Sequence, residues 1–255
     1  MWEKSLKPLK ESTFIDKIFD IYKRLEIKKN LILFGPPLSG KTTFSERIQK
    51  FLPYIVHLST GDLLRENVKN NTPFRVKVKD FMDKGVLVPD GLVVELVRDR
   101  LNKKDVKNYG CILDGFPRNL KQCIELDRII KIDLFLLLEV PRDLLMKRVL
   151  GRYSCQKCGT VYNKFTLPPR YENICDKCGD EIRFIQRSDD NEETFNKRMD
   201  VYEQNVKPII EYYKKLNLLK IINAENTLSF TDDELKQILD VGDVRDYYII
   251  YRSLL

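Results

Sequence analysis

The residues with the clearest capacity for chemistry lie in a glycine-rich loop that follows a short apolar run. Residues 35–42, Gly-Pro-Pro-Leu-Ser-Gly-Lys-Thr, fit the pattern G-x-x-x-x-G-K-[ST]. In such a loop, backbone N–H groups surround phosphate oxygens, the lysine reaches the terminal phosphates and the hydroxyl lies near magnesium. Apolar residues 31–34 precede the loop and helix-forming residues 44–50 follow it, as the motif requires. The pattern favours a nucleoside triphosphate site over a strand–helix turn without a ligand.

Four cysteines form a second constellation. They make two C-x-x-C pairs with 16 residues between them, namely Cys155, Cys158, Cys175 and Cys178. Each pair can form a tight knuckle, and two knuckles complete a tetrahedron of thiolates around zinc. Four thiolates leave no open position for a catalytic water, so the predicted zinc is structural. The alternative is two disulfides; the first 29 residues carry no secretory signal, which favours a reducing compartment and therefore zinc.

Scattered arginines and one aspartate complete the candidate chemistry. Phosphoryl transfer needs alignment, exclusion of water and cations around the phosphate oxygens. Asp114 ends a predicted strand, where it either organises magnesium through water or is a turn aspartate before glycine. The arginines that fall near predicted loops are Arg65, Arg118, Arg148, Arg152, Arg187 and Arg198. Each of them alone could be a solvated charge, because the chain holds 45 Lys and Arg.

The elements that must position these residues alternate between apolar runs and helical patterns. This alternation predicts an α/β fold with a parallel sheet covered by helices. Strands are predicted at 31–34, 54–58, 110–113, 132–140 and 218–222, and helices are predicted to begin near residues 41, 90, 120, 141, 192 and 232. Residues 59–88 and 151–187 interrupt this rhythm. We expect both to be insertions over the carboxyl edge of the sheet, where ligands bind in such folds.

Length and charge set limits on the class of protein. The 255 residues suit one sizeable domain with small insertions, and no apolar run approaches the roughly 20 residues of a membrane span. The net charge of +7 does not by itself indicate nucleic acid, because acidic residues are spread throughout. Residues 15–25 predict an amphipathic helix that packs on the core, with a membrane or partner helix as the alternative. Residues 246–251 form an apolar, aromatic tail that either docks on the body or meets another subunit.

An ordered set of motifs makes the chain similar to adenylate kinases and their relatives, the long-lid nucleoside monophosphate kinases. The motifs span residues 31–222 and comprise the phosphate loop, Ser-Thr-Gly-Asp-Leu-Leu-Arg at 59–65, Asp-Gly-Phe-Pro-Arg at 114–118 with Gln122, Arg148-x3-Arg152, the four cysteines, and Arg187-x-Asp-Asp-x3-Thr-x3-Arg198. The resemblance implies a five-stranded parallel sheet of the P-loop NTPase type, flanked by helices and bearing two inserted flaps. It implies a core of residues 30–58, 89–150 and 188–255, a monophosphate-binding flap at 59–88, a zinc lid at 151–187 and a helical N-terminal extension at 1–29.

The resemblance also implies a role for each motif residue. The donor nucleotide would be bound by Gly35, Ser39, Gly40, Lys41, Thr42, Thr43, Arg148 and Arg152. The acceptor AMP would be bound by Thr60, Arg65, Leu87, Val88, Gly115, Arg118, Gln122, Arg187 and Arg198. Catalysis would depend on Lys41, Asp114, Arg118, Arg152, Arg187 and Arg198, with Asp114 orienting hydrated Mg²⁺. Cys155, Cys158, Cys175 and Cys178 would bind the structural Zn²⁺.

The implied activity is reversible transfer of the γ-phosphoryl group of ATP or GTP to AMP. Gln122 favours an adenine acceptor, because its amide can pair with a ring nitrogen and with the exocyclic amine. The alternatives are a UMP or CMP kinase, whose family pattern has Asn at that place and a short lid, and a catalytically weak nucleotide-binding protein with a zinc knuckle. The donor stays open between ATP and GTP, because residues 223–226 match the family pattern poorly.

Two residues of the loop depart from the family pattern. Leu38 stands where relatives usually have glycine, and it either narrows the loop or points outward. Phe44 replaces a polar residue near the donor nucleotide. Beyond the nucleotides and the two metal ions, we expect no nucleic-acid partner, no membrane span, a monomer, and a cytoplasmic or mitochondrial location.

Overall fold

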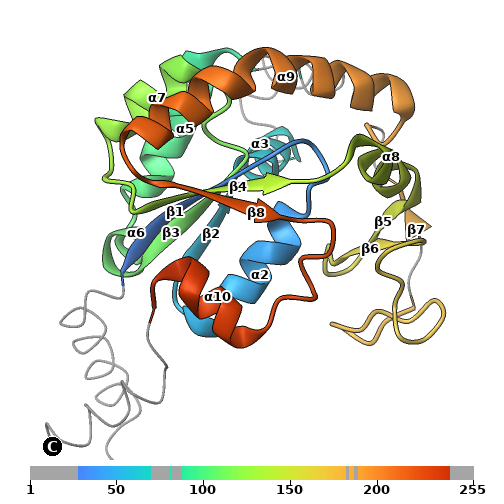
Figure 1. The fold of residues 1–255 in the computed structure, drawn as a ribbon. Coiled ribbons are helices and arrows are strands. Elements are labelled where there is room, and N and C mark those ends of the chain that lie inside the picture. The colour runs from blue at the N-terminus through green and yellow to red at the C-terminus, as the bar shows by residue number, and fades with distance from the viewer. Residues whose placement is uncertain (1–27, 70–80, 82–87, 182–183, 187–188, 242–255) are drawn as a thin grey trace, which may run out of the picture.

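A five-stranded parallel sheet forms the centre of the computed structural model, which describes residues 28–69, 81, 88–181, 184–186 and 189–241 (Figure 1). The strand order is β2-β3-β1-β4-β8. The strands are β1 (Lys29–Phe34), β2 (Val56–Ser59), β3 (Gly110–Asp114), β4 (Leu134–Glu139) and β8 (Leu219–Asn223). The predicted α/β fold with five parallel strands is therefore confirmed. The predicted N-terminal helix and aromatic tail lie outside the described residues.

The register of the sheet brings the candidate chemistry together. Strand β1 lies between β3 and β4, and its Leu33 pairs with Asp114 on one side and with Leu136 on the other. Parallel strands end at the same edge, so the loop that leaves β1 lies beside Asp114 at the end of β3. Ser59, the last residue of β2, pairs with Asp114 as well. Three segments far apart in the sequence thus meet at one edge.

Helices cover both faces of the sheet and bury its strands (Figure 1). Helices α5 (Asp90–Leu101), α7 (Leu120–Asp127) and α9 (Glu192–Lys215) cover one face, and α2 (Lys41–Phe51) and α10 (Asp232–Leu239) cover the other. Side chains of β1 alternate between the two layers: Ile32 and Phe34 pack with the first cluster, Leu31 and Leu33 with the second. Burial on both faces explains why these strands are continuous apolar runs in the sequence.

The helix starts follow from local signals, with one shift. Helices α2, α5, α7, α9 and α10 begin where the sequence predicts, and the last three have side-chain caps at Asn119, Asn191 and Thr231. Helix α8 (Arg142–Gly151) begins one residue later than predicted, with Pro141 in extended backbone as its N-cap. The predicted strand at 54–58 begins only at Val56, because residues 52–55 form a turn closed by a hydrogen bond from Ile55 N–H to Leu52 O.

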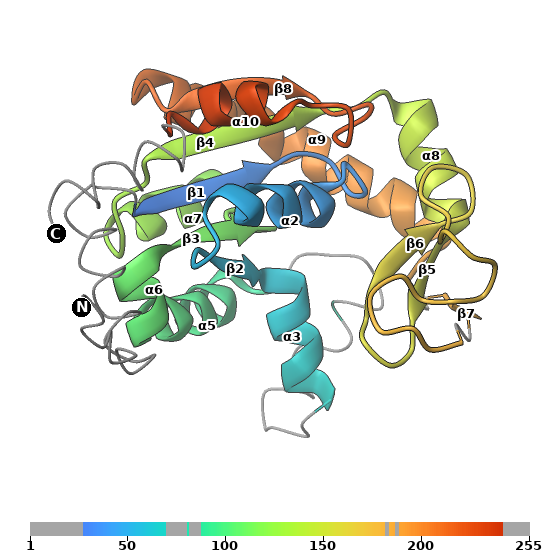
Figure 2. The same ribbon diagram turned by 90° about the horizontal axis from the view of Figure 1, so that it is seen from below.

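Two parts of the fold have no counterpart among the predicted elements. Helix α6 (Lys104–Tyr109) is a short helix before β3. The cysteine-rich segment contains a three-stranded antiparallel sheet, in the order β6-β5-β7, made of β5 (Arg152–Cys155), β6 (Val161–Asn163) and β7 (Phe184–Ile185). It follows α8 directly and lies beyond the carboxyl edge of the main sheet, while α3 (Thr60–Lys69) projects from β2 on the same side (Figure 2). Within the described part of the chain, no helix is long and apolar enough to cross a membrane.

Candidate active site

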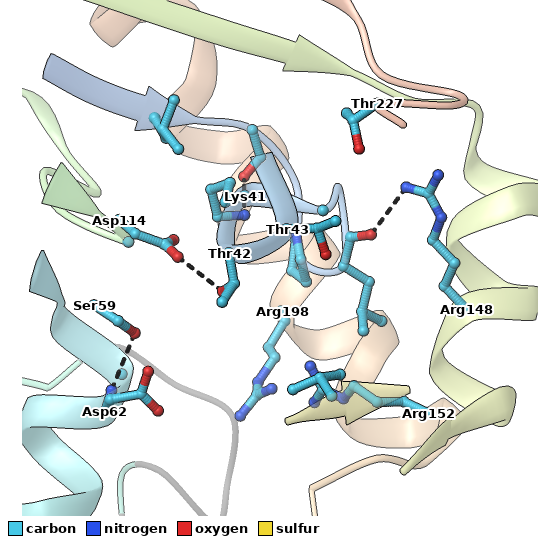
Figure 3. Close-up of a pocket in the computed structure, with 18 of the residues that line it drawn as sticks. Lys41, Thr42, Thr43, Ser59, Asp62, Asp114, Arg148, Arg152, Arg198 and Thr227 are labelled. Carbon is cyan, nitrogen blue, oxygen red and sulfur yellow. Dashed lines mark hydrogen bonds between the residues drawn. The ribbon is translucent and has the colours of Figure 1, made fainter. Parts of the chain in front are cut away.

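A cavity of about 650 Å³ lies at the carboxyl edge of the main sheet. Its walls come from the phosphate loop, α3, the loop after β3, α8, the small sheet, α9 and the turn at residues 225–228. Figure 3 shows Arg148 and Arg152 reaching into it from the side opposite Asp114. The cavity therefore joins, in three dimensions, motifs that the sequence spreads over more than half of the chain.

Most of the site residues predicted from the sequence lie around this cavity. Those that line it are Gly35, Gly40, Lys41, Thr42, Thr43, Arg65, Val88, Asp114, Gly115, Arg118, Arg148, Arg152 and Arg198. Ser39, Thr60 and Gln122 are buried behind its surface. Leu87 and Arg187 lie outside the described residues.

The phosphate loop has the backbone of an anion cradle. Gly35 has φ 152°, and a Cβ there would lie 2.6 Å from the carbonyl oxygen of Leu138, so only glycine fits. Gly40, with φ 88°, is the N-cap of α2, which has no side-chain cap and no acidic residue in its first turn. The N–H groups at the start of that helix, together with the helix dipole, are suited to bind an anion.

Lys41 is folded back onto this loop. Its Nζ donates hydrogen bonds to the carbonyl oxygens of Gly35 (3.2 Å) and Pro36 (2.9 Å) and to Ser39 Oγ (3.2 Å). Desolvation in the cavity lowers the pKa of Lys41 to about 8, against the attraction of Asp114 and with the help of repulsion from two nearby arginines. The surroundings thus disfavour the protonated, positively charged form of Lys41, and a bound phosphate group would stabilise that form.

Asp114 is the acidic centre of the site. Its Oδ2 accepts a hydrogen bond from Thr42 Oγ1 at 3.1 Å, and His57 Nε2 lies 3.3 Å from the same oxygen. Burial opposes ionisation of this carboxyl, but the bonds from His57 and Thr42 and the charge of Lys41 outweigh it and hold its pKa below the usual range. A carboxylate beside the loop hydroxyl is a donor set that suits hydrated Mg²⁺.

Sequence reasoning did not identify His57, the one histidine of the chain. It lies on β2, two residues before Ser59, and its ring reaches Asp114 across the β2–β3 pair. The signal that could have found it is this pairing: Ser59 pairs with Asp114, so a side chain two residues earlier on β2 points to the same face of the sheet.

The arginines of the site are held by oxygen atoms of the protein itself. Arg148 donates to the carbonyl oxygens of Leu38 (3.2 Å), Ala224 (3.2 Å) and Glu225 (2.8 Å). Two further pairs are guanidinium–carboxylate contacts, Arg152 with Asp190 and Arg198 with Asp189. The same kind of oxygen acceptor is offered by a phosphate group, which guanidinium groups bind in the same geometry.

The predicted acceptor side shows the same arrangement. Arg65 pairs with Asp62 one turn earlier in α3, and Arg118 Nε donates to Gly115 O at 2.7 Å. Gln122 is only 1% exposed: its amide donates to Asp90 at 2.7 Å and accepts from the backbone N–H of Arg118 at 2.7 Å.

The two departures in the phosphate loop have different environments. Phe44 is fully buried in the core between α2 and α10, and its ring centroid lies 5.9 Å from that of Phe230. It does not line the cavity, because its position on α2 turns the side chain into the core and away from the loop. Leu38 lines the cavity and has φ 66°, a left-handed backbone that costs a leucine about 1–2 kcal/mol.

The four cysteines converge as a metal site requires. All four Sγ atoms lie within 4.8 Å of one another, with Cys155–Cys178 at 3.7 Å and Cys158–Cys175 at 3.5 Å. A disulfide needs about 2.05 Å, whereas the edges of a tetrahedron with Zn–S bonds of about 2.3 Å are about 3.8 Å long. The donor set therefore fits zinc and does not fit the two disulfides.

The environment of Cys175 also favours a thiolate. Burial opposes its ionisation, but the hydroxyl of Tyr162, 3.4 Å from Sγ, and the N–H groups of Lys177 and Cys178 lower its pKa to about 6. The turn glycines Gly159 and Gly179 both have positive φ, and their N–H groups donate to the first cysteine carbonyl of each knuckle. Each C-x-x-C pair is thus closed by its own backbone.

Comparison with known proteins agrees with this geometry. The sequence family described as adenylate kinase matches residues 33–218. The adenylate kinase of Caldicellulosiruptor bescii is 44% identical over 216 residues, 83% of this chain and 99% of that protein. The adenylate kinase of Desulforudis audaxviator is 46% identical over 211 residues, 81% of this chain and 97% of that protein.

The chain belongs to the adenylate kinase family. The resemblance stated from the motifs is confirmed, and as an adenylate kinase family member the chain is a phosphotransferase. Both relatives come from bacteria, so the comparison lends no support to the mitochondrial alternative.

Raising the pH is expected to weaken binding of a nucleoside triphosphate. The positive charge of Lys41 is present below its pKa of about 8 and is lost as the pH rises through that value. With ATP and Mg²⁺ as the probe, calorimetry from about pH 7 to about pH 9.5 should show a dissociation constant that rises above pH 8 by up to about tenfold per pH unit. In Lys41→Arg the side chain stays charged over this range, so its profile should be flat. Equal slopes in both proteins would contradict the assignment.

The purified protein is expected to hold one zinc ion per chain, bound by Cys155, Cys158, Cys175 and Cys178. Cys155→Ser removes one thiolate, so zinc content should fall and amide hydrogens in residues 152–181 should exchange faster, since the metal holds this segment together. Elemental analysis and hydrogen exchange measure the two effects. Cys123→Ala, on α7, should keep its zinc. A parent protein without zinc would disprove the assignment.

Proposed function

We propose that this protein catalyses the reversible, magnesium-dependent transfer of the γ-phosphoryl group of ATP or GTP to AMP. The observation that carries the proposal is that cationic side chains from α3, the loop after β3, α8, β5 and α9 line one cavity together with Lys41 and the N-terminus of α2. The arginines concerned are Arg65, Arg118, Arg148, Arg152 and Arg198. A site for a single triphosphate needs no second cationic wall, whereas two phosphate-bearing substrates do. The name adenylate kinase, carried by both relatives, supports AMP as the acceptor.

The donor side of the cavity is built around the phosphate loop. The N–H groups at the start of α2 and the Nζ of Lys41 would bind the β- and γ-phosphates in place of the carbonyl oxygens that Lys41 now contacts. Arg148 joins the loop to the turn at 225–228, which also lines the cavity. The ribose and base of the donor would therefore lie against this turn.

Magnesium, when bound to the donor phosphates, would supply positive charge that reduces the repulsion between these phosphates and the phosphate of the acceptor. Thr42 and Asp114 would hold it: their hydroxyl and carboxylate oxygens already lie 3.1 Å apart, and the lowered pKa keeps Asp114 ionised at neutral pH.

The acceptor side lies between α3 and the loop after β3. Arg65 and Arg118 would bind the phosphate of AMP, exchanging Asp62 and Gly115 O for phosphate oxygens. Gln122 would read the adenine. Its amide is now held between Asp90 and the N–H of Arg118, so contact with a base requires it to share or exchange one of these partners.

The reaction needs alignment rather than a covalent intermediate. An oxygen of the AMP phosphate attacks the γ-phosphorus in line, the bond to the β-phosphate oxygen breaks, and two diphosphates result. Arg152 would release Asp190, and Arg198 would release Asp189. The freed guanidinium groups would then stabilise negative charge on the oxygens of the transferring phosphoryl group, together with Lys41 and, by the family pattern, Arg187. All these groups come from one chain, so the transfer would need no residue from a second copy.

Product formation with AMP is the first test. With ATP or GTP as donor, AMP should be converted to ADP at a kcat/KM at least about tenfold above that for UMP, CMP or GMP, because an amide that pairs with adenine leaves unpaired groups against other bases. Coupled assays with each acceptor measure this, and the same assays compare the two donors. Faster turnover of UMP would indicate a pyrimidine kinase, and nucleotide binding without any product would indicate a binding protein.

Removal of the loop lysine should stop transfer without unfolding the chain. Lys41→Ala loses a cation that contacts the transferring phosphate, so kcat should fall by about 10²- to 10³-fold while Tm changes little. Lys50→Ala is the matched control: Lys50 lies in the last turn of the same helix and is exposed. Activity of Lys41→Ala near that of the control would disprove the role of Lys41.

A further inference from the structure

Leu38 has a backbone conformation that L-amino acids with large side chains rarely adopt. Four non-glycine residues in the described part of the chain have positive φ; the other three are Asn173, Asn217 and Asp240, residue types that tolerate it. A strained conformation persists only where the surroundings hold it, and such positions gather at functional sites. The contacts of Leu38 show what holds it.

The side chain of Leu38 packs against an apolar cluster between α8 and α9. The buried members of this cluster are Leu145, Val149, Phe195 and Met199. Leu38 itself is half-buried and lies on the surface of the cluster. Of the two alternatives that the sequence leaves open, the structure agrees with a side chain that points outward from the loop, toward these helices.

The same cluster positions the arginines of the cavity. Two of the arginines follow a cluster residue by three positions on the same helix, Arg148 after Leu145 on α8 and Arg198 after Phe195 on α9, and Arg152 begins β5 directly after α8. Residues three apart on a helix are neighbours on its surface. The apolar cluster therefore lies on the two helices that carry Arg148 and Arg198, whose side chains line the cavity (Figure 3).

The backbone of Leu38 makes a second contact with the same wall. Its carbonyl oxygen accepts a hydrogen bond from Arg148 Nη1 at 3.2 Å. Side chain and carbonyl thus bind the same helix, α8, from the middle of the phosphate loop. A glycine at this position would keep the backbone geometry without strain but would lose the side-chain contact.

We propose that Leu38 is a positioning residue that anchors the phosphate loop to the α8–α9 cluster and thereby sets the affinity for the donor nucleotide. The anchor fixes the loop relative to Arg148, Arg152 and Arg198 before a nucleotide enters, so less conformational freedom is lost on binding. Among the described residues, none from α3 or from the loop after β3 is a member of this cluster. The inference rests on the proposed function only in taking a nucleoside triphosphate as the ligand of the loop.

The test separates anchoring from backbone strain. Leu38→Gly and Leu38→Asn both accept positive φ and both remove the apolar contact, whereas Leu38→Met keeps an apolar side chain of similar volume. Calorimetry with ATP and Mg²⁺, without acceptor, should show a dissociation constant about tenfold higher for the glycine and asparagine variants. Leu38→Met should restore most of the affinity. The dissociation constant for AMP should stay within about twofold in all three, since the acceptor side is not anchored here.

Met146→Ala is the control for general loss of packing. Met146 lies on α8 and packs on the same cluster, but it does not line the cavity. It should lower Tm and leave the ATP dissociation constant within about twofold. The proposal is overturned if the glycine and asparagine variants bind ATP as the parent does, or if their affinities for ATP and AMP fall in parallel. Because binding is measured without transfer, a parent that binds ATP but forms no ADP would refute the proposed function and leave this test intact.

Discussion

The cost of holding several cations together in one desolvated cavity is the constraint on which the rest of the structure depends. Lys41 shows this cost directly, because burial, followed by repulsion from Arg118 and Arg152, lowers its pKa to about 8. The chain offsets this cost with its own oxygens: loop carbonyls hold Lys41 and Arg148, and the carboxylates of Asp189 and Asp190 hold two further arginines. Phosphate oxygens of the proposed substrates would replace these carbonyl and carboxylate oxygens. The cations are therefore already in place for a polyanionic ligand before it binds.

The parts of this arrangement that could be predicted from the sequence are those determined by residues close together in the chain. The phosphate loop is specified by its glycines, since Gly40 has the left-handed backbone, with φ 88°, that begins α2, and by that helix itself. The cluster of four cysteines is specified by the spacing of Cys155, Cys158, Cys175 and Cys178, whose knuckles close through backbone hydrogen bonds within each pair. The buried strands are specified by unbroken apolar runs. In each case the physical cause acts within a few residues, so the pattern is visible in the chain.

What could not be predicted depends on partners distant in the chain. The approach of His57 to Asp114 follows from the pairing of β2 with β3, and the direction of Phe44 follows from the packing of α10 against α2. The small antiparallel sheet has strands of two to four residues held around the thiol cluster, so it lacks the apolar period that marks a strand. The burial of Gln122 depends on Asp90, 32 residues earlier.

The two ends of the cavity are consequently built on different principles. At the proposed donor end, packing fixes the loop: Leu38 lies on the cluster of α8 and α9, and Arg148 binds three carbonyl oxygens. At the proposed acceptor end, polar contacts dominate, and Arg65 pairs with Asp62 within its own helix. Apolar packing resists displacement in any direction, whereas hydrogen bonds and exposed ion pairs exchange readily for those of a ligand. A leucine with a left-handed backbone at position 38 is consistent with this division. Its side chain would add rigidity to the phosphate loop, and a glycine at the same position would not.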